Sequence, residues 1–272
     1  MSNAVQNTQD KKKLGQYIMI AGPTASGKSQ LAKDLASAVD GEVVNADSIQ
    51  LYSDLSVLTA RPSVGDMGDI VHHLYGVLDG AQRASVAVWL GLAAKAMTAI
   101  RARGRIPIVI GGTGMYLDAA INGIAPTPDV PITIHDAATT LYEEIGGAAF
   151  RQKLSVLDPP VAARLVDGDR QRLIRAMGVV TATGKPLSAW QAGAHKGALE
   201  GRPIKLAMLP PREILYKRID DRFDLMLESK VLDEVKRLVQ RRLDPTLPLM
   251  KALGLSALIS VLNEEITLEE IK

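Results

Sequence analysis

An eight-residue stretch, GPTASGKS at residues 22–29, carries residue types that bind phosphate. It fits the pattern G-x-x-x-x-G-K-[ST], in which glycines let backbone N–H groups point inward and the lysine supplies an ammonium group. The start of a following helix adds positive potential. The predicted phosphate-binding residues are Gly22, Pro23, Thr24, Ala25, Ser26, Gly27, Lys28 and Ser29. The Ser29 hydroxyl is the predicted ligand of a Mg²⁺ ion, and the pattern leaves the reaction open.

A carboxylate follows the second apolar run of the sequence. This run, EVVNA, ends just before Asp47, and the carboxyl ends of parallel strands are where ligands bind. A phosphate-loop NTPase needs an acidic residue at a strand end to organise Mg²⁺, but the apolar run at 106–110 ends in glycines and Thr113 instead. From the residues alone, Asp47 could act as a general base, bind the metal or cap the next helix.

Apolar runs alternate with helix-like segments around these residues. The runs YIMIA, EVVNA and IPIVI are separated by stretches with helical spacing, which predicts an α/β fold with a parallel sheet like that of phosphate-loop NTPases. From about residue 122 the pattern becomes proline-rich and then all-helical, with helices expected near 136–146, 148–157, 159–166 and 170–183 and Asp169 at an N-cap position. A further strand returns at 204–210. The predicted organisation is therefore a disordered tail at 1–13, a core at 14–121 and 199–272, and a helical insertion at 122–198.

Composition narrows the class of protein. The 272 residues are 47% hydrophobic, and no stretch has the roughly 20 apolar residues of a membrane span, which predicts a cytoplasmic protein with no membrane partner. There is no cysteine, so disulfides and thiolate metal sites are excluded, and the four histidines are scattered. The net charge is only +2, but residues 151–218 hold 13 Lys and Arg against 5 Asp and Glu. A polyanion could bind this basic segment, or it could be a solvated helical surface.

Seven motifs occur together in a recognisable order. They are GPTASGKS, NADSIQLY at 45–52, TARPS at 59–63, IGGTGMYL at 110–117, DRQRLIRAM at 169–177, TGKPLS at 183–188 and YKRIDDRFDLML at 216–227. In this order and spacing the chain resembles the bacterial tRNA dimethylallyltransferases from residue 16 to about 258. The resemblance implies transfer of a dimethylallyl group from dimethylallyl pyrophosphate to the exocyclic N6 amine of the adenosine just 3′ of the anticodon, with release of pyrophosphate. It also implies a monomer that binds the tRNA anticodon stem-loop and uses Mg²⁺.

The resemblance assigns roles to individual residues. Asp47 matches the family's base, Arg222 matches an arginine that stabilises the leaving pyrophosphate, and Thr24 and Thr113 match positions near the reacting groups. Without the resemblance, Arg222 could pair with Asp220 or Asp221 on a helix surface, and the threonines could be turn residues. The residues implied to contact tRNA are Asp47, Ser48, Ile49, Gln50, Thr113, Gln171, Arg172, Leu173, Ile174, Arg175, Lys251 and Gly254.

Three other functions remain open at this level. An enzyme that prenylates free adenine nucleotides would share the donor site, although a mononucleotide hardly needs a basic helical insertion. A phosphate-loop kinase would turn over ATP. A nucleic-acid-binding module without catalysis would bind tRNA but not consume the donor.

Overall fold

The computed structural model describes residues 15–271, so the predicted tail at 1–13 lies outside the described residues. The chain divides into two compact units. One contains the residues up to Ile121 and those from Gly197 onward, and the other is Asn122–Lys196. Each unit has hydrophobic clusters of its own.

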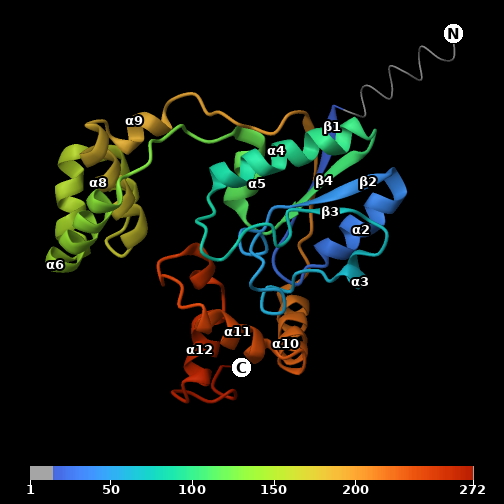
Figure 1. The fold of residues 1–272 in the computed structure, drawn as a ribbon. Helices are drawn as coiled ribbons and strands as arrows, with labels where there is room; N and C mark the ends of the chain where they lie inside the picture. The colour runs from blue at the N-terminus through green and yellow to red at the C-terminus, as the bar shows by residue number, and fades with distance from the viewer. Residues whose placement is uncertain (1–14, 272) are drawn as a thin grey trace, which may run out of the picture. The chain divides into compact units, whose positions relative to one another are not determined.

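Five parallel strands form the sheet of the first unit, in the spatial order β3-β2-β4-β1-β5 (Figure 1). The central strands are uninterrupted apolar runs because a parallel sheet is covered on both faces. The predicted α/β class is confirmed, whereas the very short strand β3 was not among the predicted strands. The strands are β1 (Gln16–Ala21), β2 (Gly41–Asn45), β3 (His72–His73), β4 (Ile106–Gly111) and β5 (Arg202–Ala207).

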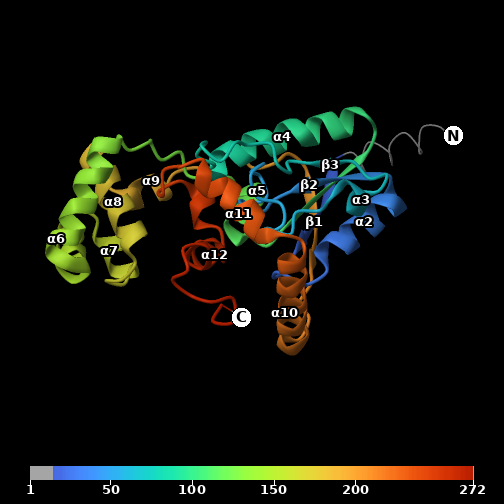
Figure 2. The same ribbon diagram turned by 60° about the horizontal axis from the view of Figure 1, so that its bottom comes forward.

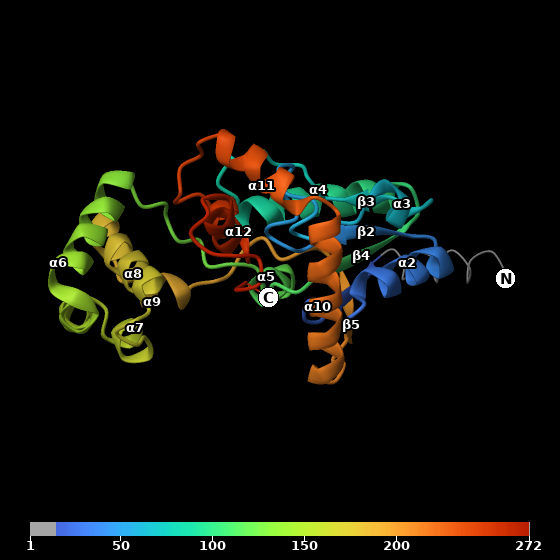
Figure 3. The same ribbon diagram turned by 90° about the horizontal axis from the view of Figure 1, so that it is seen from below.

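Helices on the two faces of the sheet are α2 (Lys28–Val39) and α4 (Val86–Ala102) (Figure 3). Small residues of α2 lie fully buried against Ile18, Val43 and Ile108, which alternate along their strands with residues that face α4. Helix α4 is tied to the sheet by Trp89, whose Nε1 donates to the Asn45 carbonyl at 2.7 Å. The short helix α3 (Val64–Met67) precedes β3, and α5 (Gly114–Asn122) follows β4.

The loops after β1, β2 and β4 meet at one edge of the sheet. A side chain at Gly111 would place its Cβ 2.6 Å from the Ala46 carbonyl oxygen, and one at Gly22 would lie 2.6 Å from the Met208 carbonyl oxygen. Glycine is required at both positions because backbone approaches so closely there. This edge therefore gathers the segments that carry Lys28, Asp47 and Thr113.

The chain after β5 forms α10 (Arg212–Glu228), α11 (Val231–Gln240), the 3₁₀ helix η1 (Pro248–Lys251) and α12 (Leu255–Leu262). Helices α11 and α12 pack on the segment after β2, where Tyr52 and Leu55 are fully buried in their shared cluster. Helix α10 has no buried residue, and Figures 2 and 3 show it projecting from the edge of the sheet. Its apolar stripe is at most half-buried, with Ile219 39% exposed.

The second unit is a helical cluster made of α6 (Ile132–Leu157), α7 (Pro159–Arg164), α8 (Arg170–Thr183) and α9 (Leu187–Gln191). The two helices predicted at 136–146 and 148–157 are both present within α6, where a kink separates them at Gly146, whose φ of 75° is not helical. Helix α8 begins and ends where the sequence predicts. Asp169 stands at its N-cap position without capping it, because its carboxylate accepts from Arg172 at 2.8 Å instead.

No helix in the part of the chain that the structure describes is long and apolar enough to cross a membrane.

A buried carboxylate at the start of β2 makes the stability of the fold pH-dependent. Glu42 is fully buried and accepts hydrogen bonds from Arg103 and His73, each at 2.6 Å. Burial by itself raises the pKa of Glu42, but the hydrogen bonds and charges of Arg103 and His73 more than offset it and lower the pKa to about 2.

The pKa of Glu42 lies below its unfolded value, so its contribution is present above that value and lost as the pH falls from about 5 to about 2. We expect this contribution to reach about 3 kcal/mol in the free energy of unfolding at neutral pH. Urea unfolding of Glu42→Gln should show a large deficit at pH 7 that shrinks at pH 3, whereas the exposed Glu200→Gln should match the wild-type protein at both. An equal deficit at the two pH values would contradict the assignment.

Candidate functional site

The phosphate loop joins β1 to α2 and is held in a strained but defined path. Ala25 and Gly27 have left-handed φ values of 61° and 94°. Lys28 turns back over the loop, where its Nζ donates to the Pro23 carbonyl at 2.6 Å and lies 3.4 Å from the Ser26 hydroxyl. An alternation of left-handed residues turns successive backbone N–H groups toward one concavity, which is an anion-binding arrangement.

A pocket of about 170 Å³ opens over this loop. The loop, the segment after β2, the end of β4 and helix α10 all contribute to its walls, through Thr24, Lys28, Ser29, Asp47, Gln50, Thr59, Gly111 and Arg222 among others. Asp47 and Arg222, 175 positions apart in the sequence, are thereby brought to the same pocket as the loop. Sequence motifs that are separate along the chain therefore form one site.

Two half-buried cations face this pocket. Burial lowers the pKa of Lys28, Asp47 opposes that change and Arg222 adds to it. Burial also lowers the pKa of Arg222. Two positive groups that are both partly removed from water repel one another, so an anion bound between them offsets part of the desolvation and the repulsion. The electrostatics of the pocket thus favour a highly charged anion such as a di- or triphosphate.

Asp47 is oriented by the turn that follows β2. Its Oδ1 accepts from the backbone N–H groups of Ile49 at 2.9 Å and Gln50 at 3.2 Å, and its own N–H donates to the Asn45 side chain at 2.8 Å. Among the described residues, no hydrogen bond reaches Oδ2 of Asp47. One carboxylate oxygen therefore fixes the side chain and the other remains available to accept a proton.

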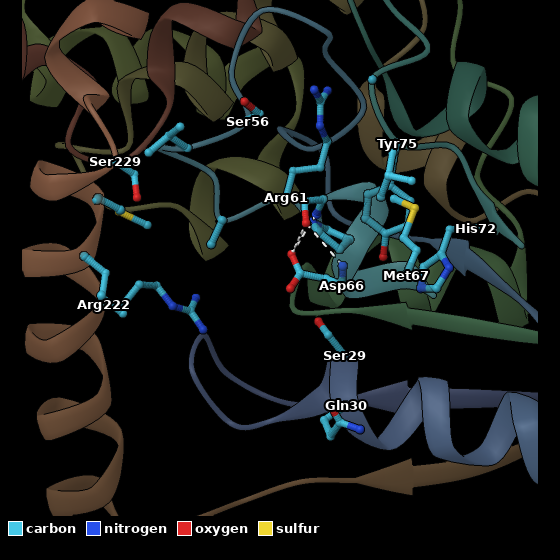
Figure 4. Close-up of a pocket in the computed structure, with 18 of the residues that line it drawn as sticks. Ser29, Gln30, Ser56, Arg61, Asp66, Met67, His72, Tyr75, Arg222 and Ser229 are labelled. Carbon is cyan, nitrogen blue, oxygen red and sulfur yellow. Dashed lines mark hydrogen bonds between the residues drawn. The ribbon is translucent and has the colours of Figure 1, made fainter. Parts of the chain in front are cut away.

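A larger cavity of about 1100 Å³ adjoins the first and shares Ser29, Gln30, Ala60 and Arg222 with it. Figure 4 shows Ser29 and Gln30 on α2, with Arg222 reaching from α10 toward the phosphate loop. Apolar residues such as Val57, Met67 and Met226 line other parts of the cavity. A molecule with a charged end and an apolar end would find both environments in these adjoining spaces.

The segment at 56–60, which lines both spaces, is held by a carboxylate that sequence analysis did not single out. Glu234 of α11 is 3% exposed, and its Oε1 accepts from the Ser56 N–H at 2.6 Å and the Val57 N–H at 2.9 Å. Its Oε2 accepts from the Leu58 N–H at 2.9 Å. Nothing local in the sequence indicates that these residues meet, since 178 positions separate Glu234 from Ser56.

Replacing Glu234 with glutamine is expected to lower the free energy of unfolding by about 1–3 kcal/mol, because an amide NH₂ would face a backbone N–H that has lost its acceptor. The loosened segment should also raise the KM for a ligand of the pocket. The adjacent, exposed Asp233→Asn is the matched control, compared by urea unfolding. If both variants unfold at the same urea concentration, Glu234 does not anchor the segment.

Comparisons with known proteins identify a family to which this chain is similar. A family model described as IPP transferase matches residues 50–272, and one described as isopentenyl transferase matches residues 15–74. The chain is 46% identical to the tRNA dimethylallyltransferase of Rhodopseudomonas palustris (strain ATCC BAA-98 / CGA009), over 93% of this chain and 79% of that protein. It is 47% identical to the tRNA dimethylallyltransferase of Methylobacterium sp. (strain 4-46), over 94% and 84%. The chain belongs to the IPP transferase family.

Solved structures support the same membership. The full-length tRNA isopentenylpyrophosphate transferase of Bacillus halodurans is similar with a TM-score of 0.64 and 30% identity, over 94% of this chain and 80% of that one. A eukaryotic dimethylallyltransferase acting on tRNA is similar with a TM-score of 0.78 and 29% identity, over 94% and 65%. The predicted resemblance and the predicted fold are thus confirmed.

For several residues of this IPP transferase the sequence left both a functional and a structural role open, and the structure shows where each of them lies. Arg222 lines the pocket, and Asp221 pairs with Lys217 at 2.9 Å. Tyr52 and Tyr116 are 0% and 3% exposed, so both belong to the core. Thr24 lines the pocket, whereas Thr113 lines neither space and accepts helix α5 N–H groups through its carbonyl.

Some residues predicted to contact tRNA are corrected by their burial. The side chains of Leu173 and Ile174, 0% and 3% exposed, form the core of the helical unit, because the inner face of α8 packs on α6. Ile49 is half-buried and packs on the cluster around Tyr52. The side chains of Leu173 and Ile174 therefore serve packing and offer almost no surface to RNA, whereas Ile49 keeps part of its surface exposed.

Other predicted contacts lie on accessible surface within their own units. Gln171 and Arg172 are exposed on α8, and half-buried Arg175 donates to the Pro128 carbonyl at 3.1 Å. In the first unit Lys251 and Gly254 are exposed and Ser48 is half-buried. Gln50, also half-buried, donates from Nε2 to the Thr59 carbonyl at 2.8 Å and so supports the pocket wall.

Proposed function

We propose that the protein transfers a dimethylallyl group from dimethylallyl pyrophosphate to the exocyclic N6 amine of the adenosine 3′-adjacent to the anticodon of tRNA, releasing pyrophosphate. The observation that carries the proposal is the convergence of the phosphate loop, Asp47 and Arg222 on one pocket in a member of this family. Two similar proteins are named tRNA dimethylallyltransferase, which supports the same substrates for this chain.

The pyrophosphate end of the donor binds the phosphate loop. Charge builds on the pyrophosphate as the allylic C–O bond breaks, and the loop N–H groups, Lys28 and Arg222 stabilise it because they are fixed in place and partly shielded from water. The cavity next to the pocket gives the five-carbon group an apolar approach.

Asp47 acts as the general base. The adenine amine is a weak nucleophile because its lone pair is delocalised into the ring, so it must lose a proton as the new C–N bond forms. The electron pair of the broken C–O bond leaves with pyrophosphate, and the proton passes to Oδ2 of Asp47. Thr24, within the phosphate loop, lines the pocket and orients the donor.

Mg²⁺ fits this site through the bound donor. The described residues contain no group of three or more His, Asp or Glu side chains arranged to hold a metal ion. The exposed Ser29 hydroxyl lines the pocket and makes no hydrogen bond within the described residues, so it is free to act as one ligand, with pyrophosphate oxygens and waters completing the shell. When bound, the ion would neutralise charge on the leaving group.

The acceptor base must leave its stack to reach Asp47, which single-stranded anticodon loops allow at small cost. Exposed Gln171 and Arg172, with Arg175, Ser48, Gln50, Lys251 and Gly254, remain the proposed tRNA contacts. We also propose that the protein works in the cytoplasm as a monomer, and light scattering would measure its oligomeric state.

The test is transfer of radiolabel from dimethylallyl pyrophosphate to an anticodon stem-loop RNA with adenosine at the target position. A stem-loop with guanosine there, AMP and ATP are run in parallel. Label on the adenosine RNA alone is expected. Label on AMP alone would favour the free-nucleotide enzyme, phosphate release from ATP without prenyl transfer would favour a kinase, and RNA binding without any transfer would favour a binding module.

A further inference from the structure

Helix α10 contributes a second arginine near the phosphate loop, four residues before Arg222. Arg218 donates from Nη1 to the Ala25 carbonyl at 3.2 Å, across 193 positions of sequence. Residues four apart lie on one face of a helix, so Arg218 and Arg222 extend toward the same loop.

The contact falls on the most constrained part of the loop. Ala25 has a left-handed φ of 61°, which costs free energy for a residue with a side chain. A Cβ at Gly27, the other left-handed position, would lie 3.9 Å from Arg218 Nη1, so the guanidinium borders both. C=O and N–H of a trans peptide lie in one plane and point in opposite directions, and the Ser26 N–H that follows Ala25 donates to the Pro23 carbonyl at 3.3 Å. The hydrogen bond from Arg218 to the Ala25 carbonyl therefore fixes the same peptide plane that closes this turn of the loop.

Helix α10 needs such an attachment. Its C-terminal end packs through Met226 and Leu227 on the cluster around Tyr52, but residues 212–219 are exposed except for the half-buried Leu215, so hydrophobic packing holds the part that carries Arg218 weakly. The Arg218–Ala25 hydrogen bond joins the helix to the loop one turn away from Arg222. The position of Arg222 in the pocket and the conformation of the loop therefore share one contact.

We infer that Arg218 is a positioning residue that holds the phosphate loop in its anion-binding conformation and sets α10 so that Arg222 reaches the pocket. The inference rests on the proposed function for its substrate, but it concerns the binding of any pyrophosphate. Arg218 acts through the loop and Arg222, and it lines neither of the two spaces described above.

The experiment compares Arg218→Met, Arg218→Lys and Lys217→Met. Lys217 is the matched control, because it lies on the same helix, is exposed and, among residues 15–271, forms its ion pair with Asp221 of its own helix. Inorganic pyrophosphate binding by calorimetry, the donor KM, kcat and the melting temperature are measured. We expect Arg218→Met to weaken pyrophosphate binding and raise the donor KM by roughly ten-fold or more, at an unchanged melting temperature. Arg218→Lys should recover part of the loss, since an ammonium can also donate to a carbonyl, and Lys217→Met should behave as the wild type.

The inference has two parts, that Arg218 holds the loop and that it positions Arg222. Pyrophosphate binding to Arg222→Met and to the Arg218→Met/Arg222→Met double variant tests them separately. If Arg218 sets Arg222, its replacement should cost less affinity once Arg222 is absent. Equal losses in both backgrounds would overturn the link to Arg222. An Arg218→Met variant with wild-type affinity and KM, or one whose losses only follow a lowered melting temperature, would overturn the inference. Failure of the proposed function would show differently, as wild-type pyrophosphate binding without label on RNA.

Discussion

Replacing Asp47 with asparagine is expected to lower kcat for prenyl transfer to the adenosine stem-loop by roughly 10²–10⁴-fold. Asparagine keeps an oxygen that can accept from the Ile49 and Gln50 N–H groups, so the turn after β2 should survive. Its amide cannot take the proton that the adenine amine must lose. The measurement is single-turnover transfer of radiolabel, so that product release does not mask the chemical step.

Pyrophosphate affinity is the control for this prediction. Asp47 lines the pocket, but its negative charge opposes anion binding, so Asp47→Asn should bind pyrophosphate as tightly as the wild type or more tightly. A variant with near wild-type kcat would exclude Asp47 as the base. A variant that loses pyrophosphate binding and kcat together would indicate a collapsed loop.

Replacing Lys28 with methionine is expected to lower kcat/KM for the donor by roughly 10²–10³-fold. Methionine matches much of the length of lysine but removes the ammonium group that neutralises developing charge on pyrophosphate. Steady-state kinetics with varied donor, together with calorimetric binding of pyrophosphate, would measure the effect. Lys95→Met, an exposed substitution on α4, is the control and should leave both values unchanged.

The pH dependence of the donor reaction is a second test of whether the positive charge of Lys28 is needed. Burial lowers its pKa from the ordinary lysine value of 10.5, so the free enzyme should lose this positive charge at a lower pH than an exposed lysine would. We expect kcat/KM for the donor to fall as the pH rises through that lowered pKa, because the uncharged amine cannot attract pyrophosphate. Lys28→Met should lack this alkaline limb, and a limb that persists in the variant would belong to another group.

Local segments were predictable where the residues of one short stretch are enough to determine its conformation. The phosphate loop needs only glycines, a lysine and the strand and helix that flank it, and α8 was placed correctly from periodicity and flanking residues. The two helical parts of α6 were also predictable, because Gly146, whose φ of 75° is not helical, interrupts the helix at that point.

Which side chains of a helix face the core was less predictable than the position of the helix in the sequence. The motif at 169–177 placed Gln171, Arg172, Leu173, Ile174 and Arg175 together as RNA contacts, although a helix must turn some of its residues inward. The structure buries Leu173 and Ile174 against α6. Helix α10 shows the same dependence on the rest of the fold, since Met226 and Leu227 pack on the cluster around Tyr52 whereas Ile219 is 39% exposed.

The sequence by itself determined the parallel α/β class, the phosphate loop, the family and the identity of Asp47 and Arg222 as candidates. The fold class and the phosphate loop depend on residue type and short-range spacing, because local chain geometry places such residues on one face or in one turn. The family and the roles of Asp47 and Arg222 were implied by the resemblance, which the order of the seven motifs carries. Only the tertiary structure decided that Arg222 reaches the loop, that Arg218 holds its Ala25 carbonyl and that Glu234 anchors the segment at 56–60. Each of these contacts joins residues more than 170 positions apart, and the folding of the whole sheet with its C-terminal helices is what brings them together.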